Sequence, residues 1–521
     1  MAAQPQDVRT MDEAFKKLLE ADTHVEHISD ALRRNNPMSP GPTLVPVARY
    51  IDHRYHELEK KKLWRKVWQM ACHEDDLPNV GDVVPYDIAD MSFIIVKVAE
   101  DEYKAFYNAC LHRGRKLREA RAKQLDELRC PFHGWTWNID GSLKQVPCAY
   151  DYNGLNRDDE ALPEARLARW GRFVFINPDP NCDPFEDHVG DLDSQFPLLP
   201  YEKRYKSAHV AKIVRANWKV VQEAFMESYH VLMTHPQILT GGANDLCTKY
   251  DAFGNYSRAI RCGALEGAMP SFEPVEVDGV HKVQHPLNGW VYEDLGDEVV
   301  QVTTPKGKVG KFTVDADWLE GELTDANPHL CNWVGGKKLS SGAMAQDPRT
   351  ISRVRKKLGS AANARTVGAE MQREMLRDLV PSVADTIPDI ELTSSIYLTL
   401  FPNYHPWGSF NSINYRFRPN GDNPDECIWE CMFLQPIPED GDYEPVKEVH
   451  WLGPDDDYTD APELGMLVKV FNQDLRNLTH VYAGMKATAR EHLRLADYNE
   501  LKLRHFHELY EKWVGDVEGS S

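Results

Sequence analysis

Two short motifs, each of which pairs a cysteine with a histidine, constrain the fold of this chain more than any other feature. Segments 110–114 and 130–134 read Cys-Leu-His-Arg-Gly and Cys-Pro-Phe-His-Gly, and seventeen residues separate the first histidine from the second cysteine. Thiolates and imidazoles at such spacing hold either a zinc ion or an iron–sulfur cluster. The chain must therefore fold so that the two loops face each other. The four candidate ligands are Cys110, His112, Cys130 and His133.

The spacing favours a [2Fe–2S] cluster over zinc. A CxH pair is unlike most zinc fingers, whereas two thiolates on one iron and two imidazoles on the other define a Rieske centre. Gly114 and Gly134 allow the tight turns that such loops need, because glycine lacks a Cβ atom. The two motifs closely resemble the Rieske-domain family. A structural zinc site is the alternative.

A second group of chemically active side chains lies in residues 217–236. Glu223, Glu227 and His230 follow i, i+4, i+7 spacing and should share one face of a helix over about 218–234. His235 lies five residues beyond His230, and Pro236 should end the helix there so that the second imidazole turns back toward the first. From spacing alone, two histidines on a helix are as consistent with core packing as with metal binding.

The order of these motifs resembles the α-subunit of Rieske non-haem iron oxygenases over nearly the whole chain. The resemblance implies a mononuclear iron held by His230, His235 and a carboxylate. The segment FNQDLRN matches the family's helix that supplies this carboxylate, which makes Asp474 the candidate, with Asp497 and Glu500 as alternatives. Two histidines and one carboxylate suit Fe(II), because open positions remain for O2 and substrate.

Glu227 marks a departure from the family pattern. The family usually has Asp three residues before the first histidine ligand, where the carboxylate links the cluster of one subunit to the iron of the next. Glutamate keeps the charge and the acceptor oxygens and adds one methylene group. We therefore expect Glu227 to serve in catalysis as this bridge, with a shifted backbone.

The resemblance also implies the activity and the partners. It predicts the terminal oxygenase of a multicomponent system that cis-dihydroxylates an aromatic ring compound with O2. The electrons would come from NAD(P)H through a separate reductase, with or without a ferredoxin, because no nucleotide-binding glycine motif is present. The expected assembly is a homotrimer or a multiple of it, with or without a β subunit. The alternatives are a Rieske monooxygenase or O- or N-demethylase, and, in another class, an electron carrier or a zinc-stabilised binding module.

The predicted architecture is α+β. We expect N-terminal helices in 1–75, a small all-β Rieske [2Fe–2S] domain in 76–180 and a catalytic domain in 181–521 with an elaboration at about 240–390. The catalytic domain should hold an antiparallel sheet and helices, which the resemblance implies is a helix-grip (START-like) fold. Helical spacing marks four further segments: 11–35, 50–72, 463–491 and 497–514.

Composition restricts the partners and the location. Lys plus Arg total 60 against 81 Asp plus Glu, and a net charge of −21 disfavours nucleic acids and anionic membranes. No apolar run reaches the length of a membrane span, so we expect a cytoplasmic protein. The run Arg113, Arg115, Lys116 and Arg118 is either a docking site for an acidic electron carrier or a solvated charge run. The candidate substrate-pocket residues are Phe225, Met226, Val231, Leu232, Phe401 and Asn403.

Overall fold

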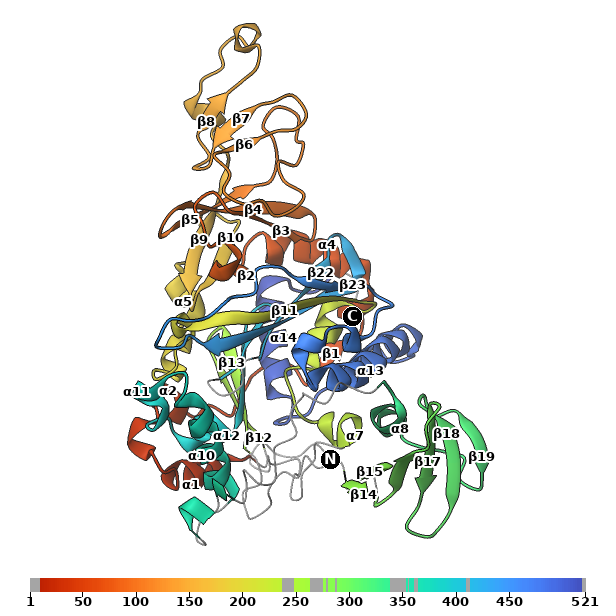
Figure 1. Cartoon of the computed structure of the whole chain (residues 1–521). Helices are drawn as coiled ribbons and strands as arrows, with labels where there is room; N and C mark the ends of the chain where they lie inside the picture. Colours follow the sequence, from red (N-terminus) through yellow and green to blue (C-terminus); the bar gives the residue numbers. More distant parts are fainter. Residues whose placement is uncertain are drawn as a thin grey trace.

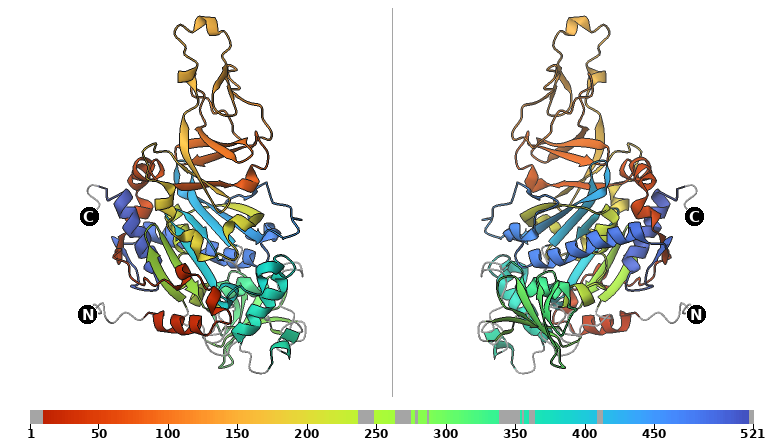
Figure 2. Two further views of the ribbon diagram at one scale, coloured as in Figure 1. Left: turned by 90° about the vertical axis from the view of Figure 1, so that its left-hand side faces the viewer. Right: turned by 90° about the vertical axis from the view of Figure 1, so that its right-hand side faces the viewer.

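The computed structural model describes residues 10–236, 248–262, 275–277, 280–285, 288–337, 353–354, 356–359, 364–408 and 413–517. A narrow β-rich unit stands above a central sheet, and further elements lie below that sheet (Figure 1). The side views show the same projecting tip from two directions (Figure 2). This arrangement of a small all-β unit and a larger unit of antiparallel strands and helices confirms the predicted α+β class.

The N-terminal segments are less helical than predicted. The segment 11–35 breaks into α1 (Asp12–Glu20), the short turn η2 (Val25–His27) and α2 (Asp30–Arg33). The segment 50–72 gives α3 (Ala48–Ile51), α4 (His53–Leu58) and the π-helix η3 (Glu59–Trp64), and then becomes β2 (Gln69–His73). The helical prediction fails over β2 because this fully buried strand pairs with β10 (Phe173–Asn177), a tertiary contact that helical spacing does not reveal.

The upper unit contains two antiparallel sheets. The larger one has the strand order β2-β10-β9-β5-β4-β3, and the smaller one has the order β6-β7-β8 at the tip (Figure 1). Alternating apolar residues along these strands build a core that includes Cys110 and Cys130. The remaining bounds are β3 (Val83–Ile88), β4 (Met91–Ala99), β5 (Glu102–Tyr107), β6 (Glu127–Arg129), β7 (Thr136–Asn138), β8 (Leu143–Gln145) and β9 (Glu164–Trp170).

The central sheet has eight strands in the order β12-β13-β20-β21-β22-β23-β11-β24, and all pairs except β11–β24 are antiparallel. Two long helices, α13 (Leu467–Ala487) and α14 (Leu501–Trp513), pack their apolar faces on the same core as the sheet. The strands are β11 (Arg204–Val214), β12 (Thr248–Phe253), β13 (Tyr256–Arg261), β20 (Ser395–Leu400), β21 (Tyr404–Pro406), β22 (Ile413–Asn420), β23 (Asn423–Pro436) and β24 (His450–Leu452).

The predicted elaboration contains a further sheet, antiparallel throughout, which we call the inserted sheet; its strand order is β14-β15-β16-β17-β18-β19. It has a core of its own against α8 (Pro328–Gly335) and lies beside α13 (Figure 1). The strands are β14 (Val275–Val277), β15 (Val280–Gln284), β16 (Val291–Asp294), β17 (Val299–Thr303), β18 (Val309–Thr313) and β19 (Trp318–Gly321). They are followed by α10 (Ala364–Leu376), α11 (Pro381–Ala384) and α12 (Asp389–Thr393).

A buried ionic network joins the upper unit to the central sheet. Lys206 of β11 forms an ion pair with Asp76, and its backbone N–H donates to Asp75 at 2.7 Å. Arg416 of β22 donates to Glu430 at 2.6 Å and to the carbonyl of Ala71 at 2.5 Å. Because a buried charge is costly without its partner, these contacts fix the upper unit on the sheet.

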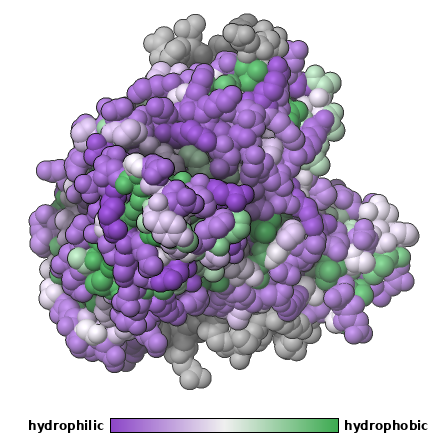
Figure 3. Space-filling model, turned by 90° about the horizontal axis from the view of Figure 1, so that it is seen from above, coloured by the Kyte–Doolittle hydropathy of each residue, from purple (hydrophilic) through white to green (hydrophobic). Residues whose placement is uncertain are grey.

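The surface agrees with the composition. Seen from the end that carries the tip, it is mainly hydrophilic, and the hydrophobic residues form small groups (Figure 3). None of the helices in the described ranges has the length and apolar character that a membrane span requires.

Candidate metal centres

The two cysteine–histidine loops have the same backbone hydrogen bonds. Gly114 N–H donates to the Cys110 carbonyl at 2.8 Å, and Gly134 N–H donates to the Cys130 carbonyl at 3.1 Å. Each cysteine N–H donates, also at 2.8 Å, to the carbonyl of the residue after the glycine. The glycines have φ of +73° and +76°, a conformation that other residues rarely adopt. The repeated sequence pattern therefore builds two equivalent turns.

The turns bring the four predicted ligands together. Cys110 and Cys130 are buried and interact through their thiols, and the His112 and His133 rings lie 4.6 Å apart between centroids. Nδ1 of His112 is buried and has no hydrogen-bond partner among the described residues, so it is available as a ligand atom.

The pairing of these side chains favours the cluster over zinc. A zinc ion would accept any two thiolates and two imidazoles in a tetrahedral arrangement. Here the two thiols lie against each other and the two imidazoles lie against each other. This pairing fits a [2Fe–2S] cluster that has two thiolates on one iron and two imidazoles on the other.

The surface around these loops exposes both aromatic and charged groups. Phe132 is 55% exposed and lies against His133, with ring centroids 3.8 Å apart and the ring planes tilted by 43°. Arg113 lies 5.2 Å from the Phe132 ring, while Lys116 pairs with Asp87 at 3.1 Å. The predicted basic run is therefore partly neutralised by local contacts.

The helix predicted over 218–234 is interrupted, which corrects the expected shared face. The chain forms α6 (Trp218–Glu223), leaves the helix and re-enters it as α7 (Val231–Thr234). Glu223 does not join Glu227 and His230, because its carboxylate accepts from Tyr50 at 3.0 Å and contacts Nε2 of His507 at 3.1 Å. Tertiary hydrogen bonds thus separate three residues that ideal helical spacing would align.

Side-chain contacts explain the interruption. Ser228 N–H donates to the Tyr250 hydroxyl at 3.1 Å instead of to a helical carbonyl. The carboxylate of Glu227 accepts from the backbone N–H groups of Tyr229 and His230, the latter at 3.0 Å, and so caps the start of α7. His235, before Pro236, ends α7 with φ −123° and ψ 51°. These two ends turn both imidazoles to the same side.

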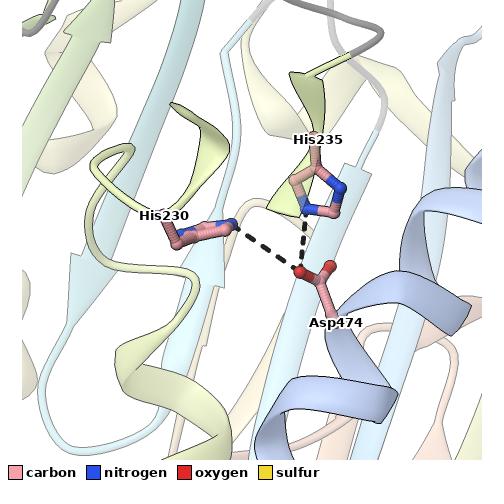
Figure 4. A group of neighbouring side chains, drawn as sticks. All are labelled: His230, His235 and Asp474. Atoms are coloured by element: carbon pink, nitrogen blue, oxygen red, sulfur yellow. Dashed lines mark hydrogen bonds and ion pairs between the residues drawn. The ribbon is translucent and has the colours of Figure 1, made fainter. Parts of the chain in front are cut away.

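His230, His235 and Asp474 form the one set of metal-compatible side chains found in the described part of the chain. Oδ1 of Asp474 lies 2.8 Å from Nε2 of His235 and 3.6 Å from Nε2 of His230 (Figure 4). The ring centroids are 5.2 Å apart. Asp474 is only 4% exposed on α13, unlike a solvated surface carboxylate. Two imidazoles and one carboxylate on one side of a site fit a mononuclear Fe(II).

The other nitrogen of each imidazole is held by a second side chain. Nδ1 of His230 contacts Oε1 of Glu227 at 2.6 Å, and Nδ1 of His235 contacts Oε1 of Gln473 at 2.7 Å. Since both oxygens can accept, each Nδ1 can keep its proton, and each Nε2, which faces Asp474, would bind a metal ion after releasing its own proton. Gln473 was not predicted, and its position directly before Asp474 is its only mark in the sequence.

Electrostatics favour a cation at this site. Burial lowers the pKa of His230, but the carboxylates of Glu227 and Asp474 outweigh burial and raise it to about 9. The same negative charge would attract a divalent metal ion.

The other predicted carboxylates lie outside this set. Asp497 is largely exposed and lies 3.6 Å from Arg504. Glu500 accepts the backbone N–H of Ala496 at 2.6 Å.

The candidate pocket residues divide into a buried group and a half-buried group. Phe401 packs on Phe506 with centroids 5.8 Å apart, and the fully buried Asn403 donates to the carbonyl of Phe417 at 2.6 Å, so both belong to the core. Met226 and Val231 are buried as well, and Leu232 is half-buried. Phe225 is half-buried and packs on a group of aromatic rings that comprises Tyr415, Phe417, Trp429 and Phe471.

Comparisons with known proteins match both units. Residues 67–156 match the family model of the Rieske [2Fe-2S] domain, and residues 199–306 and 318–516 match that of the ring hydroxylating alpha subunit (catalytic domain). The carnitine monooxygenase oxygenase subunit of Escherichia coli K12 is 31% identical over 303 residues, which cover 56% of this chain and 78% of that protein. The anthranilate 1,2-dioxygenase large subunit of Acinetobacter baylyi is 31% identical over 193 residues, covering 36% and 41%.

Solved structures share the fold. A quaternary ammonium Rieske monooxygenase superposes with a TM-score of 0.53 at 15% identity, covering 92% of this chain and 96% of that chain. A naphthalene 1,2-dioxygenase variant bound to phenanthrene gives a TM-score of 0.54 at 17% identity, with the same coverage.

Proposed function

The chain belongs to the ring-hydroxylating α-subunit family of Rieske oxygenases, and from this membership we propose that it hydroxylates a small organic substrate at a mononuclear Fe(II) held by His230, His235 and Asp474. The observation that carries the proposal is the convergence of both Nε2 atoms on one oxygen of Asp474. In this role the iron would activate O2, while the Rieske cluster would supply electrons. A simple electron carrier would have no use for the second centre.

The protein's own residues prepare the iron site. Glu227 and Gln473 hold the protonated Nδ1 of each histidine and so leave Nε2 free for the metal. Glu227 also fixes the backbone entering α7. These contacts support the proposed role of Glu227 as a positioning residue next to the iron.

The arrangement within one chain supports an assembly of several subunits. The cluster loops lie at the tip, whereas α7 lies below the central sheet at the opposite end of the molecule (Figure 1). We propose a head-to-tail homotrimer, or a multiple of it, in which His112 or His133 of one subunit lies against Glu227 of the next. A heterologous interface of this kind closes into a ring. The exposed Phe132 beside His133 would belong to that interface or to the contact with a reductase or ferredoxin.

The electron donor is proposed to be a separate reductase that uses NAD(P)H. The expected reaction consumes O2 and two electrons in each turnover.

Two oxidation outcomes remain as candidates, and a different observation favours each. The match to the carnitine monooxygenase spans 56% of this chain, against 36% for the anthranilate dioxygenase, and this favours monooxygenation, including demethylation. The half-buried Phe225 and its group of aromatic rings favour the predicted cis-dihydroxylation of a ring compound, because aromatic surfaces stack on ring substrates.

Three experiments test the proposal. The dithionite-reduced protein should give the rhombic, low-average-g EPR signal of a Rieske cluster, and a silent spectrum in protein replete with metal would contradict it. With 18O2, one labelled oxygen atom in the product would establish monooxygenation, and two would establish dioxygenation. His230→Ala should abolish substrate oxidation and leave the cluster signal intact. Normal oxidation by that variant would contradict the iron assignment.

A further inference from the structure

A third histidine lies beside the candidate iron site and comes from α8, the helix that packs on the inserted sheet. His329 occupies the first turn of α8 and is 8% exposed. Asn327 caps this helix, since its side-chain oxygen accepts from the N–H groups of His329 at 2.9 Å and Leu330 at 3.2 Å. The cap fixes where α8 begins and therefore which way His329 leaves the helix.

Three contacts tie α8 to the elements that carry the iron site. The carbonyl of His329 accepts from Nε2 of Gln473 at 3.0 Å, and Gln473 is also the residue that holds His235. Lys469 of α13 donates to the carbonyl of Trp333 at 2.8 Å, and Asn327 donates to the carbonyl of Met233 in α7 at 3.5 Å. The inserted sheet is thereby joined to both α7 and α13.

The ring of His329 has one satisfied and one unsatisfied nitrogen. Its side chain bonds to that of Asn477, whose Nδ2 donates to Thr234 at 2.8 Å, so the Asn477 oxygen faces His329 and the ring donates to it. Nδ1 is buried with no partner among the described residues. Burial, followed by the influence of His235, lowers the pKa of His329 to about 4, so the ring is neutral and Nδ1 is an acceptor.

An acceptor buried without a donor is unfavourable, and native structures retain one mainly where a ligand or an ordered water completes it. The contacts of His329 with Gln473 and of Asn327 with Met233 place the first turn of α8 beside the elements that carry the triad. We propose, building on the function proposed above, that Nδ1 of His329 accepts a hydrogen bond from the substrate. The substrate class is therefore a small molecule with a hydroxyl or N–H group close to the carbon that is oxidised.

This role also gives the inserted sheet a function. A site built to bind a hydroxyl or N–H group discriminates against an analogue that lacks it, because the buried acceptor then stays unpaired. We expect a preference of about 10- to 100-fold for the donor-bearing member of a matched pair.

Matched ligand pairs test this inference through binding rather than turnover. The dissociation constants of the anaerobic Fe(II) protein are measured for L-carnitine against γ-butyrobetaine, and for anthranilate against benzoate. The members of each pair differ by one donor group. In the pair that binds, the donor-bearing member should bind more tightly. His329→Phe should remove this preference by weakening that member alone, and His329→Gln, which retains an acceptor, should preserve it.

The outcomes separate the inference from the proposed function. The role of His329 is overturned if the wild type shows no preference, or if the preference survives in His329→Phe. In either case Nδ1 would bind an internal water instead. Failure of the wild type to bind either pair overturns the substrate class. Iron content and the EPR signal of the reduced cluster are recorded on the same samples. If the wild-type protein binds no iron or gives no cluster signal, the proposed function itself is contradicted.

Discussion

The cluster loops and the iron triad are built in different ways from similar side chains. The four cluster ligands lie within residues 110–133, on two turns that repeat the same hydrogen bonds around a glycine. The triad joins α7 to α13, and the ligand atoms of His235 and Asp474 meet although 239 positions separate them in the sequence. One site is therefore a product of local turns, and the other is a product of how the helices pack on the central sheet.

The two sites also differ in how their ligands are supported. At the tip, the backbone of the short loops positions the thiols and imidazoles. At the triad, side chains fix the rings: the distant Gln473 holds His235, and the neighbouring Glu227 holds His230. The triad should therefore be the more sensitive of the two to substitutions outside the ligands themselves.

Removal of one triad ligand should produce the largest effect, and this effect should be confined to the iron site, leaving the cluster at the tip unchanged. Asp474→Asn removes the carboxylate charge that both Nε2 atoms face, so we expect loss of bound iron and of product formation. The reduced cluster should keep its EPR signal. Metal analysis and EPR on the same sample provide the measurement. Asp497→Asn is the matched control and should change neither, since Asp497 is largely exposed. If Asp474→Asn binds as much iron as the wild type, Asp474 is not a metal ligand and the contrast between the two sites fails.

Neutralising Glu227 should separate electron delivery from metal binding. In Glu227→Gln the side chain can still contact Nδ1 of His230, so iron should stay bound, while product formation falls by about 10- to 100-fold. The rate of product formation in a single turnover of the pre-reduced protein measures this fall. An unchanged rate would show that Glu227 serves only to cap α7.

Replacing Gln473 should weaken the triad by a smaller amount. Gln473→Leu leaves Nδ1 of His235 without an acceptor, and we expect iron affinity to fall by about 10-fold, the lower end for partners of metal ligands. Competition with a chelator gives the affinity. Gln473→Glu retains an acceptor and should retain the affinity. Equal affinities for wild type and Gln473→Leu would mean that packing alone orients His235.

The junction between the two regions should respond in the acid range, through the stability of the fold and not through the bound iron. Burial raises the pKa of Asp76, but the charges of Lys206, His209 and Arg121 outweigh it and hold the pKa at about 2. Because the pKa is lower in the folded protein than the usual value of about 3.9, Asp76 adds stability above about pH 4 that is lost as the pH falls toward 2. The contribution is about 2 kcal/mol.

Denaturant unfolding, followed by tryptophan fluorescence at several pH values, measures this contribution. The difference in unfolding free energy between wild type and Asp76→Asn should shrink as the pH falls from 5 to 2.5. Asp455→Asn, at an exposed pair with Arg215, is the control and should have almost no effect at any pH. If the difference in unfolding free energy between wild type and Asp76→Asn does not change with pH, Asp76 is not the group that titrates.

The sequence predicted most where the relevant contacts are local. The upper unit is built of β-strands as predicted, and both C-terminal helices lie within the segments predicted for them. It failed where distant contacts override local spacing. The segment 69–73 is a strand because β10 pairs with it, and the helix expected over 218–234 breaks because Tyr250, Tyr50 and His507 bind its side chains and backbone.

The sequence by itself determined the cluster loops, since a cysteine, a histidine and a glycine at fixed spacing specify each turn. It also placed His230 and His235 near each other, because they lie at the two ends of one short helix that stops before Pro236. Only the tertiary structure decided that Asp474 faces these histidines, that Gln473 holds one of them and that α8 brings His329 against Gln473. Those contacts depend on the position of α13 and α8 against α7, which is set by the burial of apolar faces and cannot be inferred from spacing along the chain.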